Sequence, residues 1–122
     1  MNTLAIALKS RIQGYDGEVP VIKTEAELSK FNRDNYMREF SKKINADMVL
    51  FQTITEGLEV AYDPNGFNRK GNLVFSLNTD QGEFQFAGDF IVTRQDGQLT
   101  KEEIHLLALS LPMIFDLIGE VR

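Results

Sequence analysis

The 122-residue sequence contains no cysteine and no tryptophan, and its single histidine is His105. The lack of cysteine excludes a disulfide scaffold, thiolate zinc sites and a cysteine nucleophile, and it fits a reducing compartment such as the cytoplasm. One histidine cannot build the usual multi-histidine zinc site. We therefore expect a cytoplasmic protein that needs no cofactor.

Long apolar runs are also missing. Residues 1–15 have a short apolar stretch that is interrupted by Lys9 and Arg11, and no cleavage site of small residues follows, so a signal peptide is not expected. The most apolar segment, residues 104–118, contains Pro112 and is shorter than the roughly 20 residues needed to cross a bilayer. These features predict no association with a membrane.

Signatures of catalysis and of phosphate binding are absent from the sequence. No serine lies in a Gly-x-Ser-x-Gly elbow, and neither glycine-rich phosphate-binding pattern occurs. Glu102 and His105 have the Glu-x-x-His spacing of di-iron bundle proteins, but the pattern occurs once where those proteins use it twice. Residues 14–17 have the Gly-x-x-Gly spacing of a nucleic-acid clamp, although Asp16 would repel a phosphate. We assign no catalytic residue and no metal ligand.

Residues 96–103 match the second half of a calcium-binding EF-hand loop. The first and third ligands of that loop would be Val92 and Arg94, and neither offers a carboxylate oxygen. A turn followed by a helix cap is the better explanation of this segment.

The composition indicates one globular domain over residues 1–122. The hydrophobic fraction of 43%, with nine phenylalanines, is enough for a core, and the charged fraction of 25% is ordinary for a folded protein. The net charge of −5 repels phosphate backbones at long range. Nucleic-acid binding would therefore require a local basic patch.

Two helices are predicted in the N-terminal part of the chain. After a capping residue at Thr3, apolar side chains recur every four positions, at Leu4, Leu8 and Ile12. Thr24 and Glu27 have the spacing of a capping box, which predicts a second helix over residues 25–45 with a break near residues 34–35.

From residue 47 the apolar pattern changes from helical to alternating. It predicts four strands, over residues 47–55, 58–62, 72–78 and 83–93. Tight turns with Gly57 and Gly82 and a loop over residues 63–71 join them, and Gly88 is interpreted as a bulge in the fourth strand. Consecutive strands with short connections are expected to pair as an antiparallel meander.

A second capping box, at Thr100 and Glu103, predicts a C-terminal helix over residues 101–118 that Pro112 kinks or splits in two. The helix would be apolar on most faces, which favours a homodimer formed through it over complete burial in one core. The expected fold class is α+β, with N-terminal helices, a four-stranded antiparallel meander sheet and the C-terminal helix packed on the sheet. Four side chains are expected to be buried, namely Phe75, Phe84, Phe86 and Leu107.

Two segments are predicted to bind a partner. One is the loop around Phe67, whose ring either packs back onto the sheet or is exposed to a partner. If it is exposed, an aromatic ring beside the cations Arg69 and Lys70 has the composition of an interface hot spot. The other is residues 30–43, interpreted as a helix with a basic face. The predicted partner-binding residues are Phe67, Arg69, Lys70, Arg38, Lys42 and Lys43.

The leading functional hypothesis is a non-catalytic protein-interaction domain: a small acidic accessory protein of a bacterium or phage, of the inhibitor, immunity or adaptor type. The most favoured partner is another protein. One alternative is a nucleic-acid-associated protein that uses residues 30–43 and the Phe67 loop. The other is a small enzyme or a metal binder built on carboxylates.

Overall fold

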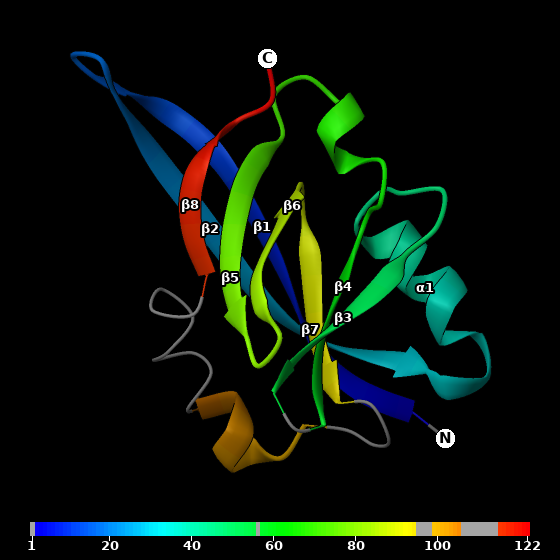
Figure 1. Cartoon of the computed structure of the whole chain (residues 1–122). Helices are drawn as coiled ribbons and strands as arrows, with labels where there is room; N and C mark the ends of the chain where they lie inside the picture. The colour runs from blue at the N-terminus through cyan, green and yellow to red at the C-terminus, as the bar shows by residue number, and fades with distance from the viewer. Residues whose placement is uncertain (1, 56, 95–98, 106–114) are drawn as a thin grey trace.

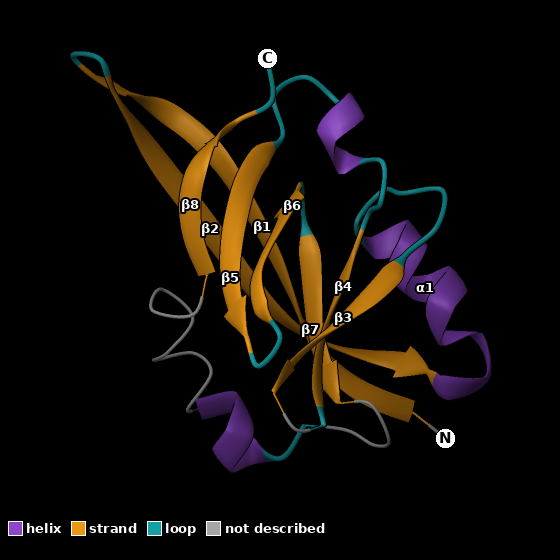
Figure 2. Cartoon of the chain, in the orientation of Figure 1, coloured by secondary structure: helices purple, strands orange, loops and turns teal. Residues whose placement is uncertain are grey.

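The computed structural model describes residues 2–55, 57–94, 99–105 and 115–122 of the chain. Its strands form two antiparallel sheets whose inner faces share one hydrophobic core (Figures 1 and 2). The larger sheet has the strand order β2-β1-β7-β4-β3 and the smaller one β6-β5-β8. The strands are β1 (Asn2–Asp16), β2 (Val19–Asn32), β3 (Leu50–Thr55), β4 (Leu58–Tyr62), β5 (Leu73–Thr79), β6 (Gly82–Ala87), β7 (Phe90–Arg94) and β8 (Phe115–Glu120).

Little of the described chain is helical. The α-helix α1 (Tyr36–Lys43) follows β2 after a short 3-10 turn, Arg33–Asn35. A second 3-10 turn, Gly66–Asn68, lies in the loop before β5, and residues 101–105 are helical. Within the described part of the chain, no helix has the length and apolar character needed to cross a membrane.

The expected α+β class is wrong, because the structure is mostly β and its N-terminal segment is strand β1. A spacing of four residues fits a period of two as well as a helical period, so the apolar repeat did not distinguish them. Ile6 and Leu8 point into the core between the sheets, whereas Ala5 and Ala7 are buried on the opposite face. A strand covered on both faces has no polar side that would reveal its alternation.

The capping box predicted at Thr24 and Glu27 is also wrong, because both residues lie in β2. The Thr24 hydroxyl oxygen lies 2.9 Å from the hydroxyl oxygen of Ser10 across the hairpin. Glu27 forms a 2.8 Å ion pair with Lys43. Of the helix predicted over residues 25–45 only α1 is present, and the predicted break coincides with the 3-10 turn before it.

The predicted meander is divided between two sheets. The turns between β3 and β4 and between β5 and β6 are where the sequence indicates them. The predicted fourth strand, however, divides at Gly88, whose φ of +100° is accessible mainly to glycine. Strand β6 pairs with β5, and β7 crosses to the larger sheet, where it pairs with β4 and β1. Because β7 joins the other sheet, the strands form a sandwich of two sheets and not the single sheet that was predicted.

Of the predicted C-terminal helix, residues 101–105 are helical. The Thr100 capping box is confirmed, since the Glu103 N–H donates to the Thr100 hydroxyl at 3.1 Å and the Thr100 N–H donates to the Glu103 carboxylate at 3.0 Å. Residues 106–114 lie outside the described residues. The prediction of a helix through Ile118 is wrong, because Phe115–Glu120 is strand β8. The expected homodimer through a long C-terminal helix therefore loses its structural basis.

Two hydrophobic cores lie on opposite faces of the larger sheet. The core between the sheets is built around four phenylalanines whose rings contact one another, Phe75, Phe86, Phe90 and Phe115. The outer core is smaller and packs Phe40 and Ile44, at α1 and its C-terminal end, against Phe31 and the alanines of the sheet. The predicted burial of Phe75 and Phe86 is confirmed, whereas Phe84 is half-buried and Leu107 lies outside the described residues.

Candidate binding surface

The Phe67 loop lies on the surface. Phe67 is 48% exposed in the 3-10 turn, and Lys70 is exposed as well. Arg69, by contrast, has partners within the chain, because its guanidinium donates to the Asn45 carbonyl and lies 3.6 Å from the buried carboxylate of Asp63. Arg69 thus connects this loop to the segment at the end of α1. A role of the loop in binding stays a prediction.

The basic residues predicted to share one helix face are distributed over three elements. Lys30 lies in β2, Arg33 in the first 3-10 turn, and Arg38, Lys42 and Lys43 in α1. Lys43 is neutralised by Glu27 at 2.8 Å. The single basic helix over residues 30–43 is therefore wrong, although α1 still has a basic side.

A further surface, which the sequence did not reveal, is the inner face of the β1–β2 hairpin. The tip of the hairpin extends beyond the body of the sandwich (Figure 1). Ile6 and Leu28 are directly paired across the hairpin and therefore lie on the same face. Ile6 is 4% exposed, and Leu28 is 50% exposed. The same contrast holds for buried Leu8 and its exposed partner Ala26. The part of this face that belongs to β1 is therefore buried, whereas the part that belongs to β2 is exposed.

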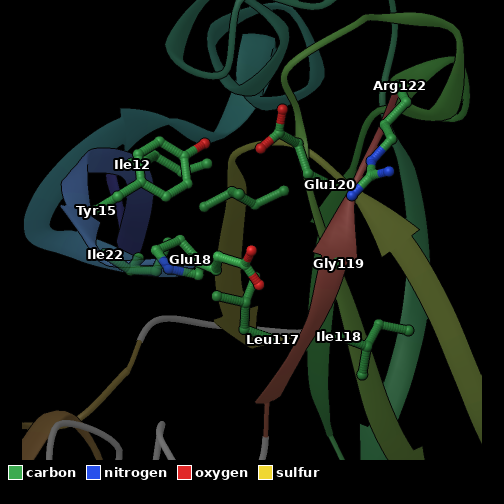
Figure 3. A pocket seen from close by; sticks show the side chains of 11 residues that line it. Ile12, Tyr15, Glu18, Ile22, Leu117, Ile118, Gly119, Glu120 and Arg122 are labelled. Carbon is green, nitrogen blue, oxygen red and sulfur yellow. The ribbon is translucent and has the colours of Figure 1, made fainter.

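The hairpin forms one wall of a cleft, and strand β8 forms the other (Figure 3). The cleft has a volume of about 350 Å³. Its walls are largely apolar, with Ile12 and Ile22 from the hairpin facing Leu117 from β8 (Figure 3). Leu117 and Ile118 are 40% and 50% exposed, so apolar surface remains in contact with water.

Strand β8 is also the edge of the smaller sheet, and its outer side has no strand partner among the described residues. Just after β8, the Val121 N–H donates to the Asn72 carbonyl, and the Val121 carbonyl accepts from the Gly71 N–H. Successive residues of an edge strand direct their backbone groups to opposite sides. The N–H and carbonyl of Glu120 therefore point away from β5, toward the open edge.

Charged and hydrogen-bonding groups surround the apolar part of the cleft. Glu18, Glu120 and Arg122 line it together with the phenol of Tyr15, which is 64% exposed (Figure 3). Two carboxylates and one guanidinium leave a small excess of negative charge. An apolar groove with polar ends and an open strand edge has the elements that peptide-binding domains use for an extended ligand.

Carboxylates with shifted pKa values do not gather in this cleft. Burial raises the pKa of Glu59 on β4, and hydrogen bonds from Ser76 and Gln85 lower the pKa of Glu83 on β6. Neither residue lines the cleft. In the described residues, no group of three or more histidine, aspartate or glutamate side chains could hold a metal ion.

A scan against protein-family models and searches of curated proteins and of solved structures found no match. The function is therefore inferred from the geometry of this chain.

One sequence signal could have located the open face of the hairpin. Between residues 22 and 28, uncharged residues occupy even positions and charged residues occupy odd positions, in the order Ile22, Lys23, Thr24, Glu25, Ala26, Glu27 and Leu28. This alternation is the pattern of a strand with one apolar face. The capping-box spacing within the same segment led instead to the helix prediction.

Proposed function

We propose that the chain is a non-catalytic protein-interaction domain that binds an extended segment of a partner protein in the cleft between the hairpin and β8. One observation carries the proposal: exposed apolar side chains of the cleft adjoin a strand edge that has no partner strand among the described residues. Exposed apolar surface with a polar rim marks interaction sites on soluble proteins. A small ligand would use the apolar surface alone, whereas an extended peptide uses the strand edge as well.

The proposed contact is strand addition. A segment paired with β8 would accept and donate hydrogen bonds at the edge position of Glu120. Because side chains of a strand alternate, every second residue of the segment would point into the cleft, toward Ile22 and Leu117. A strand as long as β8, six residues, spans about 20 Å at a rise of roughly 3.3 Å per residue.

The chemistry of the rim indicates the composition of the partner segment. The cleft has carboxylates at Glu18 and Glu120, and Asp116 lies exposed on β8. These charges favour lysine or arginine beside the apolar residues of the ligand and disfavour acidic segments and phosphate backbones. An inhibitor or adaptor that captures a flexible, basic, partly apolar segment fits this surface.

The test begins with peptides selected from a random displayed library on the immobilised protein, followed by affinity measurement for the enriched sequences. We expect enrichment of apolar residues at alternating positions with basic residues nearby. Leu117→Asp places a charge in the cleft and should weaken binding at least about tenfold, a difference of roughly 1.4 kcal/mol. Val21→Asp is the matched control, because Val21 is 44% exposed but does not line the cleft.

A second pair of variants tests the strand edge. Glu120→Pro removes the backbone donor that faces the open edge, whereas Glu120→Gln removes only the charge. Strand addition requires that the proline variant lose binding while the glutamine variant keeps most of it. Equal binding to both variants and to Leu117→Asp would overturn the proposal. A dimer in light scattering that Leu117→Asp converts to a monomer would identify a second copy of the chain as the occupant and overturn the assignment to a different protein.

A further inference from the structure

A groove on a different part of the molecule lies beside α1. It is formed by one side of the helix and the segment 46–49 that follows it, and its volume is about 490 Å³. Two methionines line it, Met37 from the helix and Met48 from the segment. Each is 47% exposed. Methionine side chains are flexible and polarizable, and they are frequent on surfaces that adapt to more than one ligand.

The same groove has basic side chains. Arg38 and Lys42 line it, and Asp47 is its one acidic lining residue. Within the described part of the chain, Arg38 and Lys42 form no salt bridge, whereas the neighbouring Lys43 is paired with Glu27. The whole chain has a net charge of −5, so this groove is positive on an otherwise acidic protein. Its charge is opposite to that of the cleft beside β8.

We infer that the groove beside α1 is a second docking site, and that its occupant is an acidic segment with aliphatic side chains from a partner protein. The aliphatic side chains contact Met37 and Met48, and the carboxylates lie near Arg38 and Lys42. Opposite charges at the rim raise the association rate and select the partner, whereas the apolar contact provides most of the affinity. A helix docked in a groove is a common form of such recognition.

The two methionines favour a peptide over a nucleic acid. A phosphate backbone is bound by several cations along its path, and each contact contributes to a steep dependence on salt. The groove has two cations and one carboxylate, and its floor is apolar. A protein with excess negative charge also repels a polyanion at long range. An oligonucleotide is therefore the competing ligand in the test.

The probe is a fluorescein-labelled peptide of about 12 residues, enough for three helical turns, with leucine along one side and glutamate along the other. Fluorescence anisotropy with the full chain should show saturable binding. A peptide with lysine in place of every glutamate, a peptide with serine in place of every leucine, and single-stranded oligothymidine should each bind at least about tenfold more weakly.

Variants of the chain locate the site. Lys42→Glu should weaken the acidic peptide at least about tenfold, whereas Lys101→Glu, which changes the net charge by the same amount on another exposed surface, should change its affinity less than about twofold. Met48→Ser should also weaken binding, and far-ultraviolet circular dichroism verifies that each variant is folded. The inference is overturned if the acidic peptide does not bind, if Lys42→Glu and Lys101→Glu have equal effects, or if oligothymidine binds more tightly than the peptide. Because the β8 cleft shares no residue with this groove, these outcomes are independent of the strand-addition tests.

Discussion

Strands β1 and β2 belong to one hairpin, and their burial differs greatly. In β1, successive residues from Ala5 to Leu8 are buried, on one face by the smaller sheet and on the other by the outer core. In β2, the residues that pair with this stretch are mostly exposed. A sheet of five strands faces a sheet of three, and the smaller sheet covers β1 but not β2. The comparison shows that the burial of a strand depends on the width of the opposing sheet as well as on its own sequence.

The most direct test of this comparison uses the pair Ile6 and Leu28. Ile6→Ala leaves a cavity between the sheets and should lower the free energy of unfolding by about 2–5 kcal/mol. Leu28→Ala removes a half-exposed side chain from the same face and should cost less than about 1 kcal/mol. Urea unfolding, followed by circular dichroism, measures both values. Equal losses in the two variants would mean that the inner face of β2 is covered as well as that of β1.

The hydroxyl pair at the boundary between the two strands should give a smaller effect. The Ser10 side chain is nearly buried, and its hydroxyl lies 2.9 Å from that of exposed Thr24. Thr24→Val keeps the β-branched shape and removes this hydrogen bond, so we expect a loss of about 0.5–1.5 kcal/mol in chemical unfolding. Thr24→Ser keeps the hydroxyl and should retain more of the stability. The prediction fails if the serine variant is the less stable of the two.

The smallest effect is expected on the outer face of β2, where Glu27 and Lys43 connect the strand to α1. The hydrogen bond and the positive charge of Lys43 lower the pKa of Glu27. A carboxylate with a lowered folded-state pKa stabilises the fold above its ordinary pKa of about 4.3, and that contribution is lost as the pH falls through the folded-state pKa. Glu27→Gln should be slightly less stable than the original chain at neutral pH and equally stable at low pH. Thermal unfolding at a series of pH values measures the difference in stability between the variant and the original chain. This difference should become smaller as the pH falls, and an increase would contradict the prediction.

Features set by nearby residues could be predicted from the sequence. The turns at Gly57 and Gly82 and the capping box at Thr100 each depend on a few adjacent residues, and each is present. The division into two sheets depends instead on pairing between distant segments, above all β1 with β7. The helix prediction for β1 failed because its apolar spacing suits two periods and both of its faces are buried.

The candidate surfaces also differ in how far the sequence predicts them. The sequence places Phe67 in a polar loop but leaves open whether its ring is exposed, whereas the basic side of α1 is visible in the sequence. The cleft beside β8 is not visible in the sequence, because Ile12 and Leu117 meet only after β8 has joined the smaller sheet and the hairpin has joined the larger one. Its location follows from the relative position of two sheets, which alternation within a single strand does not encode.

The pairing of β1 with β7 also imposes an order on folding during synthesis. The hairpin can form as soon as residues 2–32 have left the ribosome, because its contacts are local. The inner edge of β1 then stays unpaired until β7 has been synthesised, since Ile6 pairs with Val92. Throughout that interval a strand with successive apolar residues has an unprotected edge, a condition that promotes association between nascent chains. The slow step of folding is therefore expected to be the docking of β7, and the yield of folded protein should depend on the concentration of unfinished chains.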